Sequence, residues 1–411
     1  MFRLTCAVRG YDWGSTSLIP RFLDQPADGS TQAELWVGAH PGDPARLPDG
    51  RGLDAYIRAE PGAALGPDVT DAFGERLPYL VKALAAARPL SLQVHPTSQR
   101  ARDGYAMEDH AGTPIGAPER SYQDRHHKPE LILALTRFEG MAGFRDVEKS
   151  AQILRMLQHP WADGVADELE SGPAFQVLHS VVADALSRSG DALTRLVAEI
   201  AESARTAEDN GHRSSRPTGR RYLDRNSVER EGTRLFAQTA ALADLYPSDP
   251  GVLVTLLLNH VVLSPGEAMF LDAGVVHAYT SGFGVEVMAS SDNVVRAGLT
   301  SKHVDVAELL QIASFTPMPP PLWEPADTGA NVLTYAPPVT EFALSVAQAP
   351  TADLPSSGPR VVLVLDGSLD VRTETGAEAL TRGEALFVEH ADGAISLTGS
   401  GTAAVASVPA G

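Results

Sequence analysis

The chain has 411 residues, 43% of them hydrophobic, and its 52 acidic against 33 basic side chains give a formal net charge of -19. A chain of this length exceeds what one hydrophobic core usually covers, so we expect two or three domains of an ordinary globular protein. The acidic balance argues against a general affinity for nucleic acid or anionic membranes, and an anionic substrate would need a local basic pocket.

The cysteine content and the N-terminal segment bear on the compartment. The only cysteine, Cys6, excludes an intrachain disulfide framework and fits a reducing compartment. Turn-forming residues at 11–14 stand where a signal peptide would have its apolar core, and no uninterrupted apolar run reaches the roughly 20 residues needed to span a bilayer. We therefore expect a cytoplasmic monomer without nucleic-acid or membrane partners.

Residues 1 to about 60 predict short strands and turns, including an aromatic and β-branched strand over 34–38, and a helix is expected before Gly74. The following stretch, 77–93, is densely apolar, and Lys82 stands alone within it. An isolated lysine of this kind usually lays its carbon chain along apolar neighbours while its amine reaches water. The alternative is an amine directed into a pocket that holds an anion.

The run 91–96 alternates like a strand, so the side chains of Gln93 and His95 leave the same face of the sheet. Pro96 cannot donate to the ladder, which places the pair at the end of the strand. That face can hold a metal ion. The competing interpretation is an edge strand that turns two polar residues toward water.

The polar segment 103–125, with its glycines and prolines, is typical of a loop over a site. It leads into an apolar strand in which Lys128 and Glu130 share one face by the period of two. Opposite charges at this spacing commonly form a solvated ion pair at a strand end, which contributes little stability. The alternative makes Glu130 a metal ligand and leaves Lys128 free for substrate.

From about residue 146 the apolar period changes from two to about 3.6, which predicts a helical region between two β regions. A polar segment rich in arginine, serine and glycine interrupts this region over 205–230. We expect that segment to be a solvated loop, with a lid that attracts an anionic substrate as the alternative. A further helix follows and ends before Pro247 and Pro250.

β structure returns at 263–279, where a strand leads into an Asp-Ala-Gly turn and the next strand carries His277 and, two residues later, a tyrosine on one face. The spacing of Gly266, Asp272, Gly274 and His277 resembles the second metal motif of the cupin superfamily. Asp272 stands where that motif usually has proline.

A related phrase recurs near the C-terminus. Residues 383–388 repeat the pattern of 266–271, a strand that opens out of a glycine turn. Ala394 stands at the position that corresponds to His277, so the second copy should lack the metal. A duplication of β-barrel halves, one active and one structural, explains the repeat.

The glycine-flanked segment 284–305 crowds together Asp292, Arg296 and Lys302. With the polar residues of the earlier strands they make a candidate site. Its possible metal ligands are Gln93, His95, Glu130 and His277. Two imidazoles, a carboxylate and an amide oxygen suit Zn²⁺ as a Lewis acid. Basic groups beside such a metal suit an anionic, oxygen-rich substrate.

The combination of these phrases resembles the type I mannose-6-phosphate isomerases, also called phosphomannose isomerases. The matching phrases lie at 13–14, 34–38, 90–96, 127–131, 274–279, 291–300 and 302–303. One departure is that the family often has an acidic residue and a lysine soon after its His-Pro pair, whereas this chain has Thr97-Ser98-Gln99-Arg100.

The resemblance implies roles for the site residues. It implies one zinc ion per chain, with the ligands Gln93, His95, Glu130 and His277. It makes Arg296 the catalytic arginine. It also implies that Ser91 and Lys82 help to hold the phosphate of a small sugar phosphate, and that the sugar pocket is lined by Lys128, Asp292 and Lys302.

The expected fold is mainly β with an α-helical insertion, built from cupin-type jelly-roll barrels. We expect a catalytic domain from 1–145 and 259–317, a helical insertion domain over 146–258 and a C-terminal cupin-like barrel over 318–411. The expected reaction is the reversible conversion of mannose 6-phosphate to fructose 6-phosphate through a cis-enediol, in which Arg296 stabilises the enediolate charge. The candidates for the base are Lys128, Asp292 and Lys302.

Two other classes remain open from the sequence. The first is a non-haem Fe(II) oxygenase, because His95, Glu130 and His277 alone would make its two-histidine, one-carboxylate triad. The second is a cupin that binds a sugar phosphate without turnover. Metal content separates the first from an isomerase, and an assay of turnover separates the second.

Overall fold

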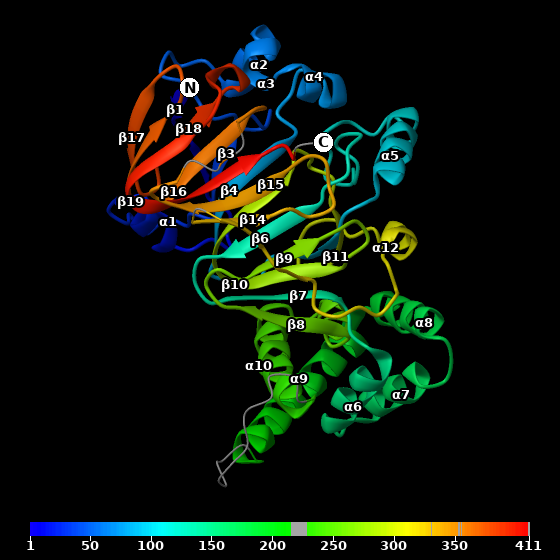
Figure 1. Cartoon of the computed structure of the whole chain (residues 1–411). Coiled ribbons are helices and arrows are strands. Elements are labelled where there is room, and N and C mark those ends of the chain that lie inside the picture. The colour runs from blue at the N-terminus through cyan, green and yellow to red at the C-terminus, as the bar shows by residue number, and fades with distance from the viewer. Residues whose placement is uncertain (215–227, 330, 352–353, 355, 410–411) are drawn as a thin grey trace.

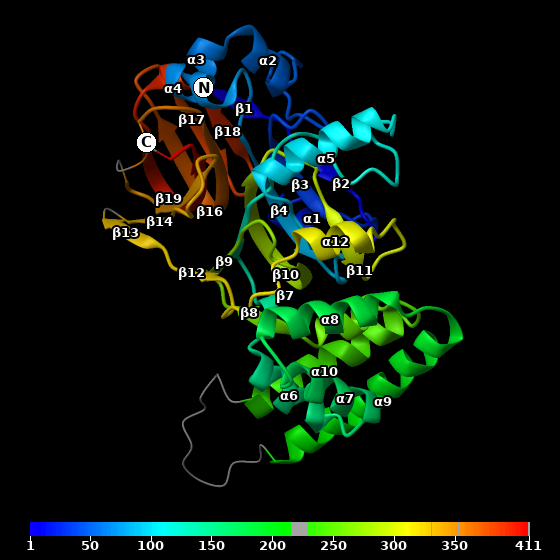
Figure 2. The ribbon, with the colours of Figure 1, turned by 90° about the vertical axis from the view of Figure 1, so that its right-hand side faces the viewer.

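The computed structural model describes residues 1–214, 228–329, 331–351, 354 and 356–409. In that part of the chain the strands form two sheets, and a group of helices lies at the opposite end of the molecule from the C-terminal sheet (Figures 1 and 2). The fold is therefore mainly β with helices, as expected. Within the described residues both sheets are open paths that do not close on themselves, so the expected jelly-roll barrels are not confirmed.

The larger sheet has 11 strands. In chain order they are β2 (Ala7–Arg9), β3 (Glu34–Gly38), β4 (Tyr79–Ala86), β5 (Leu92–Val94), β6 (Glu130–Ala134), β7 (Phe138–Phe144), β8 (Leu258–Leu263), β9 (Ala268–Leu271), β10 (His277–Ala289), β11 (Val295–Gly298) and β12 (Leu322–Trp323). The predicted strand over 34–38 is confirmed as β3.

The smaller sheet has 8 strands. They are β1 (Phe2–Leu4), β13 (Ala326–Gly329), β14 (Val332–Tyr335), β15 (Ala343–Gln348), β16 (Arg360–Arg372), β17 (Ala377–Thr381), β18 (Ala385–Val388) and β19 (Ser396–Ser407), with the 3-10 turn η1 (His390–Asp392) before β19. Strands β9 and β18 each begin two residues after a glycine in the left-handed region, Gly266 at φ +88° and Gly383 at φ +85°, so the predicted repeat of turn and strand is confirmed.

Strand β10 connects two layers of the larger sheet. Its residues 277–281 pair with β5 and β7, and its residues 282–289 pair with β4 and β6. The change of partners falls at Gly282, where φ is +126° and an added Cβ would lie 2.7 Å from the Phe138 backbone. Glycine is needed there because the strand bends and passes close to β7.

The N-terminal strand β1 joins the smaller sheet, a pairing that the sequence did not predict. Phe2 lies opposite Phe387, although the two residues are at opposite ends of the chain. The sheets also share a core, in which Tyr79 of β4 donates from its hydroxyl to the carbonyls of Pro359 and Ala406, both at 3.0 Å. These contacts dock the smaller sheet against the larger one.

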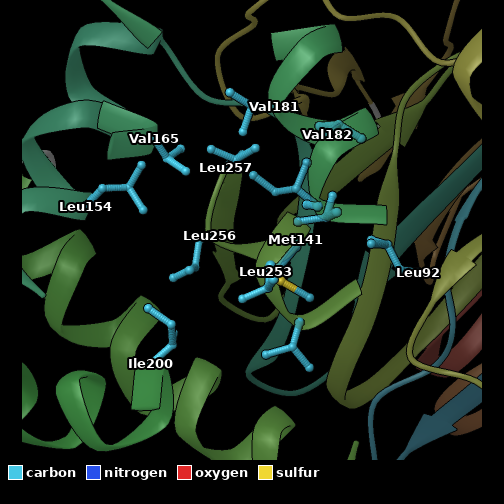
Figure 3. Packing of buried hydrophobic residues seen from close by; sticks show 14 of the residues in the cluster. Leu92, Met141, Leu154, Val165, Val181, Val182, Ile200, Leu253, Leu256 and Leu257 are labelled. Atoms are coloured by element: carbon cyan, nitrogen blue, oxygen red, sulfur yellow. The ribbon is translucent and has the colours of Figure 1, made fainter. Parts of the chain in front are cut away.

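Six helices lie between β7 and β8 in the described chain. They are α6 (Val147–Met156), α7 (Pro160–Leu169), α8 (Ala174–Ser187), α9 (Gly190–Ser214), α10 (Val228–Leu245) and α11 (Gly251–Thr255). The apolar residues at helical spacing, such as Leu154 and Ile200, are buried, which confirms the predicted change of period. Figure 3 shows these side chains packed with Leu92 and Met141 from the sheet. No helix in the described chain is long and apolar enough to cross a membrane.

The remaining helices of the described chain lie outside this group in the sequence. They are α1 (Leu18–Phe22), α2 (Leu53–Ala59), α3 (Pro61–Leu65), α4 (Pro67–Phe73), α5 (Ser98–His110) and α12 (Val306–Ile312). The helix predicted before Gly74 is confirmed as α4.

Helix α5 corrects the prediction of a loop over 103–125. Thr97 caps the helix by accepting a hydrogen bond from the Arg100 amide at 3.2 Å. Gly104 is a packing residue inside the helix, because an added Cβ would lie 2.4 Å from the Tyr122 ring. The glycine that favoured a loop in the sequence therefore permits a close contact, and only 111–125 follows as the irregular segment.

The structure corrects the predicted bounds of the arginine-rich loop. Helix α9 continues to Ser214 and α10 begins at Val228, so both ends of the predicted loop over 205–230 are helical. The expectation of a solvated loop or lid concerns residues 215–227, which lie outside the described residues. The helix predicted before Pro247 is confirmed as α10.

Candidate active site

Three strands bring the predicted polar residues onto one face of the larger sheet. Gln93 of β5 lies directly opposite His277 of β10 on one side and Arg296 of β11 on the other. Directly opposed residues of antiparallel strands project from the same face, so these three side chains share it. The flanking residues Leu92 and Val94 point the other way, into the core beneath the helices. This alternation confirms the predicted strand.

A carboxylate and two imidazoles meet at this face. His95, Glu130 and His277 place their ligand atoms within 4.8 Å of one another. The His95 Nε2 atom lies 3.3 Å from Glu130 Oε1, and His277 Nε2 lies 3.5 Å from Glu130 Oε2. The three side chains are almost completely buried, at 1–2% exposure. Buried polar groups in such a cluster need partners, which a metal ion can supply.

The backbone fixes the orientation of both imidazoles. His95 donates from Nδ1 to the Asn293 carbonyl at 2.8 Å, and His277 donates from Nδ1 to the Val275 carbonyl at 2.9 Å. In this tautomer each Nε2 carries a lone pair toward Glu130. His95 Nε2 and Glu130 Oε2 are buried without a hydrogen-bond partner in the described structure. These orphaned acceptors fit a divalent cation between them.

Charge and burial favour the ligand forms of these groups. Burial lowers the pKa of His95 to about 4, so its imidazole is neutral at physiological pH. Burial opposes the charge of Glu130, but Lys128 and the two histidines hold the pKa of Glu130 well below its usual range. Neutral imidazoles and an ionised carboxylate are the states in which these side chains bind metals.

Gln93 lies beside the same cluster. Its Nε2 is 3.3 Å from His277 Nε2, and its Oε1 accepts a hydrogen bond from the Ser91 hydroxyl at 3.4 Å. Exchanging the two ends of the carboxamide turns its oxygen toward the imidazole nitrogens, the orientation that a metal requires. Gln93 can therefore supply a fourth ligand atom.

Asn293 holds the loop behind the cluster. Its Oδ1 accepts from the amides of Gln123 at 2.7 Å and Asp124 at 3.1 Å, and its Nδ2 donates to the carbonyl of Asp124 at 2.8 Å. The hydroxyl of Ser291 donates to the Asp124 carboxylate at 2.9 Å. Because the carbonyl of Asn293 also receives the His95 ring, this network orients a candidate ligand.

A cavity of 1070 Å³, the main cavity, opens onto this face. The predicted site residues that line it are Lys82, Ser91, Gln93, Lys128, Glu130, Asp292, Arg296 and Lys302. His95 and His277 are reached through Glu130, which both contact. The structure therefore brings all ten predicted site residues together, from parts of the chain that are more than 200 positions apart.

Lys128 and Lys82 are both bonded to carboxylates. Lys128 Nζ lies 2.7 Å from Glu130 Oε1, and the pair is buried, which excludes the solvated surface pair considered from the sequence. Lys82 Nζ lies 3.0 Å from Glu286 and 3.4 Å from Glu34. The Lys82 side chain is only 8% exposed, and its amine is bonded to carboxylates instead of extending into bulk water as an isolated lysine usually does.

Arg296 and Lys302 are the predicted site cations that have no carboxylate partner in the described structure. Burial lowers the pKa of Arg296, and its guanidinium makes no side-chain hydrogen bond within the described chain. Loss of hydration and the proximity of Arg296 lower the pKa of Lys302. Asp292 is more open, with its side chain 55% exposed and its Oδ1 3.5 Å from His40 Nε2. Among the predicted site residues, the cavity thus offers two cations without a carboxylate partner and one largely exposed carboxylate.

The sequence did not identify Glu34 and Glu286 as residues of this site. Trp36 donates from its indole to Glu34 at 2.7 Å, and Glu286 lies directly opposite Lys82 in the pairing of β4 with β10. Burial raises the pKa of Glu286, against the opposing effect of Lys82. The available signal was the isolation of each charge in an apolar strand, since Glu286 stands between valines as Lys82 stands among apolar residues.

Comparisons with known proteins agree with this geometry. Residues 1–147 match the family model of the phosphomannose isomerase type I catalytic domain. The mannose-6-phosphate isomerase of Escherichia coli strain K12 is 33% identical over 412 residues, covering 98% of each chain, and that of Homo sapiens is 33% identical, covering 94% of this chain and 93% of its own.

Solved structures extend the similarity to the whole fold. The Salmonella typhimurium mannose 6-phosphate isomerase bound to fructose 6-phosphate and zinc has a TM-score of 0.85 and 32% identity, with both chains covered completely. A zinc-bound holo form of mannose 6-phosphate isomerase also has a TM-score of 0.85, at 31% identity, and covers 100% of this chain and 99% of its own. The chain belongs to the type I mannose-6-phosphate isomerase family.

Proposed function

We propose that the chain interconverts mannose 6-phosphate and fructose 6-phosphate with one zinc ion, held by Gln93, His95, Glu130 and His277. The observation that carries the proposal is the buried cluster in which His95 Nε2 and Glu130 Oε2 lack partners among the described residues. Its donor set of two imidazoles, a carboxylate and an amide suits zinc. The relatives named mannose-6-phosphate isomerase, and the Salmonella structure with fructose 6-phosphate and zinc, support the same assignment.

Arg296 is the proposed stabiliser of the transition state. Bound at this cluster, zinc would supply Lewis acidity to the oxygens of the sugar. Negative charge develops on the C1 and C2 oxygens as the C2 proton leaves to form a cis-enediol. The Arg296 guanidinium lies across β5 from the His277 side of the cluster and has no carboxylate partner in the described structure, so it is available to that charge.

Asp292 is the proposed base. A base must be able to reach the C2 proton, and the Asp292 carboxylate lines the main cavity with its side chain 55% exposed. Lys128 is less available for this role, because its amine is bonded to the Glu130 carboxylate at 2.7 Å. We assign Lys128 to hydrogen bonding with the sugar oxygens, as a cation already positioned beside the metal site.

The phosphate group is assigned to Ser91 and Lys302. Lys302 has no carboxylate partner within the described residues, and Ser91 lines the same cavity. Lys82 was expected to contact the phosphate, but Glu34 and Glu286 on either side of its amine would repel a dianion. We therefore assign Lys82 to the hydroxyl-bearing part of the sugar, and this revises the role that the family resemblance implied.

The domain division expected from the sequence remains part of the proposal. Residues 1–145 and 259–317 would form the catalytic domain, 146–258 the helical insertion and 318–411 the C-terminal domain, with cupin-type ancestry for both β parts. The turn-and-strand repeat at Gly266 and Gly383 supports a duplication. Strand β1 pairs with β18, so in this proposal the catalytic domain contributes its first strand to the C-terminal sheet.

A coupled assay tests the function directly. Fructose 6-phosphate formation from mannose 6-phosphate is measured with the protein as purified, after exhaustive chelation, and after zinc is restored without oxygen. We expect turnover, its loss, and its return. Absence of turnover in the zinc-loaded protein would overturn the isomerase assignment. Full turnover after all divalent metal has been removed would overturn the role of the metal cluster.

A further inference from the structure

A second cavity lies between helix α10 and the larger sheet. It has a volume of 480 Å³, within the range of roughly 300–1,000 Å³ that is usual for small-molecule sites. Its wall includes the guanidinium-bearing residues Arg88, Arg137 and Arg234, and we call it the arginine cavity. Glu139 is the only acidic residue among its described lining residues. An excess of positive charge is unusual in a protein whose net charge is -19.

Arg234 is the most buried of these cations. Its Nε atom is buried without a hydrogen-bond partner, and no carboxylate among the described residues lies within ion-pair distance of its guanidinium. Glu231, three residues earlier on α10, is already bonded to Arg145 at 2.8 Å and to Lys149. Burial lowers the pKa of Arg234 against the opposing effect of the Glu231 charge, and the nearby Arg137 adds to the lowering.

The other polar groups of the cavity complete a receptor for an anion. Arg137 forms an ion pair with Glu139 at 2.7 Å, and the Arg137 side chain is 64% exposed. Arg88 is exposed and has no carboxylate within ion-pair distance in the described chain. The buried Gln238 Oε1 lacks a hydrogen-bond donor among the described residues. It could accept from a hydroxyl or a protonated oxygen of a ligand.

We propose that the arginine cavity binds a small oxyanion with two negative charges, a phosphate ester or a dicarboxylate. Planar guanidiniums recognise both groups through paired hydrogen bonds, and a dianion would neutralise Arg234 and Arg88 together. The site is distinct from the main cavity but adjoins it, because Arg88, Pro89 and Leu245 line both. Residues 88–90 lead directly into Ser91 and β5, so an anion bound there contacts the segment that precedes Gln93.

Thermal unfolding of the full-length protein with inorganic phosphate or succinate tests the proposal. Phosphate can also enter the main cavity, so the titration is repeated in Lys302→Met, which weakens that second contribution. We expect each effective anion to raise Tm in the wild type and in Lys302→Met. Arg234→Met should weaken the apparent affinity of the remaining site about tenfold or more, since a charge-assisted hydrogen bond is lost. A response to phosphate alone identifies a phosphate ester as the ligand, and an equal response to succinate identifies the dicarboxylate class.

Three controls keep the result decisive. Arg195→Gln removes an exposed arginine of α9 that lines neither cavity, and it should leave the response unchanged. Without anion, Arg234→Met should keep or raise Tm, because it removes a buried charge without a carboxylate partner. If that variant fails to fold, Arg137→Gln, whose side chain is largely exposed, provides the second test. An anion response that is unchanged in Arg234→Met and Arg137→Gln, or abolished by Lys302→Met alone, overturns the proposal whether or not the protein is an isomerase.

Discussion

Gln93 and Arg296 lie directly opposite each other in the pairing of β5 with β11. Gln93 also lies opposite His277 in the pairing of β5 with β10. One short strand therefore aligns two candidate metal ligands, Gln93 and His277, with Arg296, a cation that has no carboxylate partner in the described structure. A three-residue strand thus sets the relation between the metal cluster and the proposed stabiliser of negative charge. Rigid strands hold such groups more precisely than loops do.

Arg296→Ala should lower kcat by a factor on the order of 10² or more, the size seen when one electrostatic stabiliser is removed from a water-excluded site. KM should change much less, because the charge that Arg296 stabilises develops after the substrate binds. Arg296→Lys should recover only part of the activity, since an ammonium does not span two oxygens as a guanidinium does. Steady-state kinetics of both variants measure these changes.

Zinc content and Tm accompany the Arg296 measurement. Arg195→Ala, on the exposed surface of α9, is the matched control and should retain activity. Arg296 makes no side-chain hydrogen bond in the described structure, so zinc content and Tm should stay close to those of the wild type. Lost activity together with lost zinc would instead give Arg296 a role in supporting the metal site.

Asp292→Asn should abolish most proton transfer at C2 while leaving the metal bound. The change removes the basic carboxylate but keeps its size, and Asp292 is not among the residues that form the metal cluster. The measurement is the release of deuterium from C2-labelled mannose 6-phosphate into water, beside zinc stoichiometry. Lys128→Met is the comparison, and if it alone stops deuterium release, the base is Lys128.

Removal of the metal should leave most of the fold intact. The helical core and the core shared by the two sheets are large apolar clusters that contain none of the candidate ligands, with members such as Ile200 and Phe387. Lys128 lies 2.7 Å from Glu130 and would offset its charge after the metal is removed. Circular dichroism before and after chelation should therefore change little. Unfolding of the whole chain on chelation would show that the metal is a structural requirement.

Lys82→Met should destabilise the protein by about 3 kcal/mol or more, because it leaves the buried carboxylates of Glu34 and Glu286 without their cation. Urea unfolding measures the loss. The double variant Lys82→Met with Glu286→Gln should recover part of it, and the coupling between the two changes reports their interaction. An unchanged free energy of unfolding would mean that the pair contributes nothing to stability.

Local patterns in the sequence predicted those strands and helices whose burial repeats with a regular period along the segment. The alternation around Gln93 and the helical spacing around Ile200 were sufficient because each has one buried face. Gly104 misled the prediction, because glycine favours a loop locally but here makes room for the Tyr122 ring. That ring belongs to a segment that no local pattern connects to α5.

Contacts between segments far apart in the sequence also could not be predicted. Lys82 meets Glu286 across 204 positions of sequence, and Phe2 meets Phe387 at the other end of the chain. Neither contact leaves a periodic signal in its own segment. The candidate metal ligands could be proposed because a family resemblance linked distant motifs, whereas the carboxylates around Lys82 had no such link.

The pair of Glu139 and His260 should make stability depend on pH in the acid range. His260 Nε2 lies 3.6 Å from Glu139 Oε2, and interaction with His260, supported by Arg137, lowers the pKa of Glu139 from 4.5 to about 2. A carboxyl whose pKa is lower in the folded state contributes stability that is complete above pH 4.5 and lost as the pH falls toward 2. Glu139→Gln should therefore be less stable than the wild type at pH 6, and the difference should shrink steadily between pH 4.5 and pH 2.

Denaturant unfolding of the metal-free forms measures this difference in unfolding free energy without a contribution from metal loss. Glu60→Gln, at an exposed helix end, is the control that should show no such trend. A difference that stays constant down to the lowest pH at which both proteins fold would mean that the ionised carboxylate of Glu139 does not stabilise the fold.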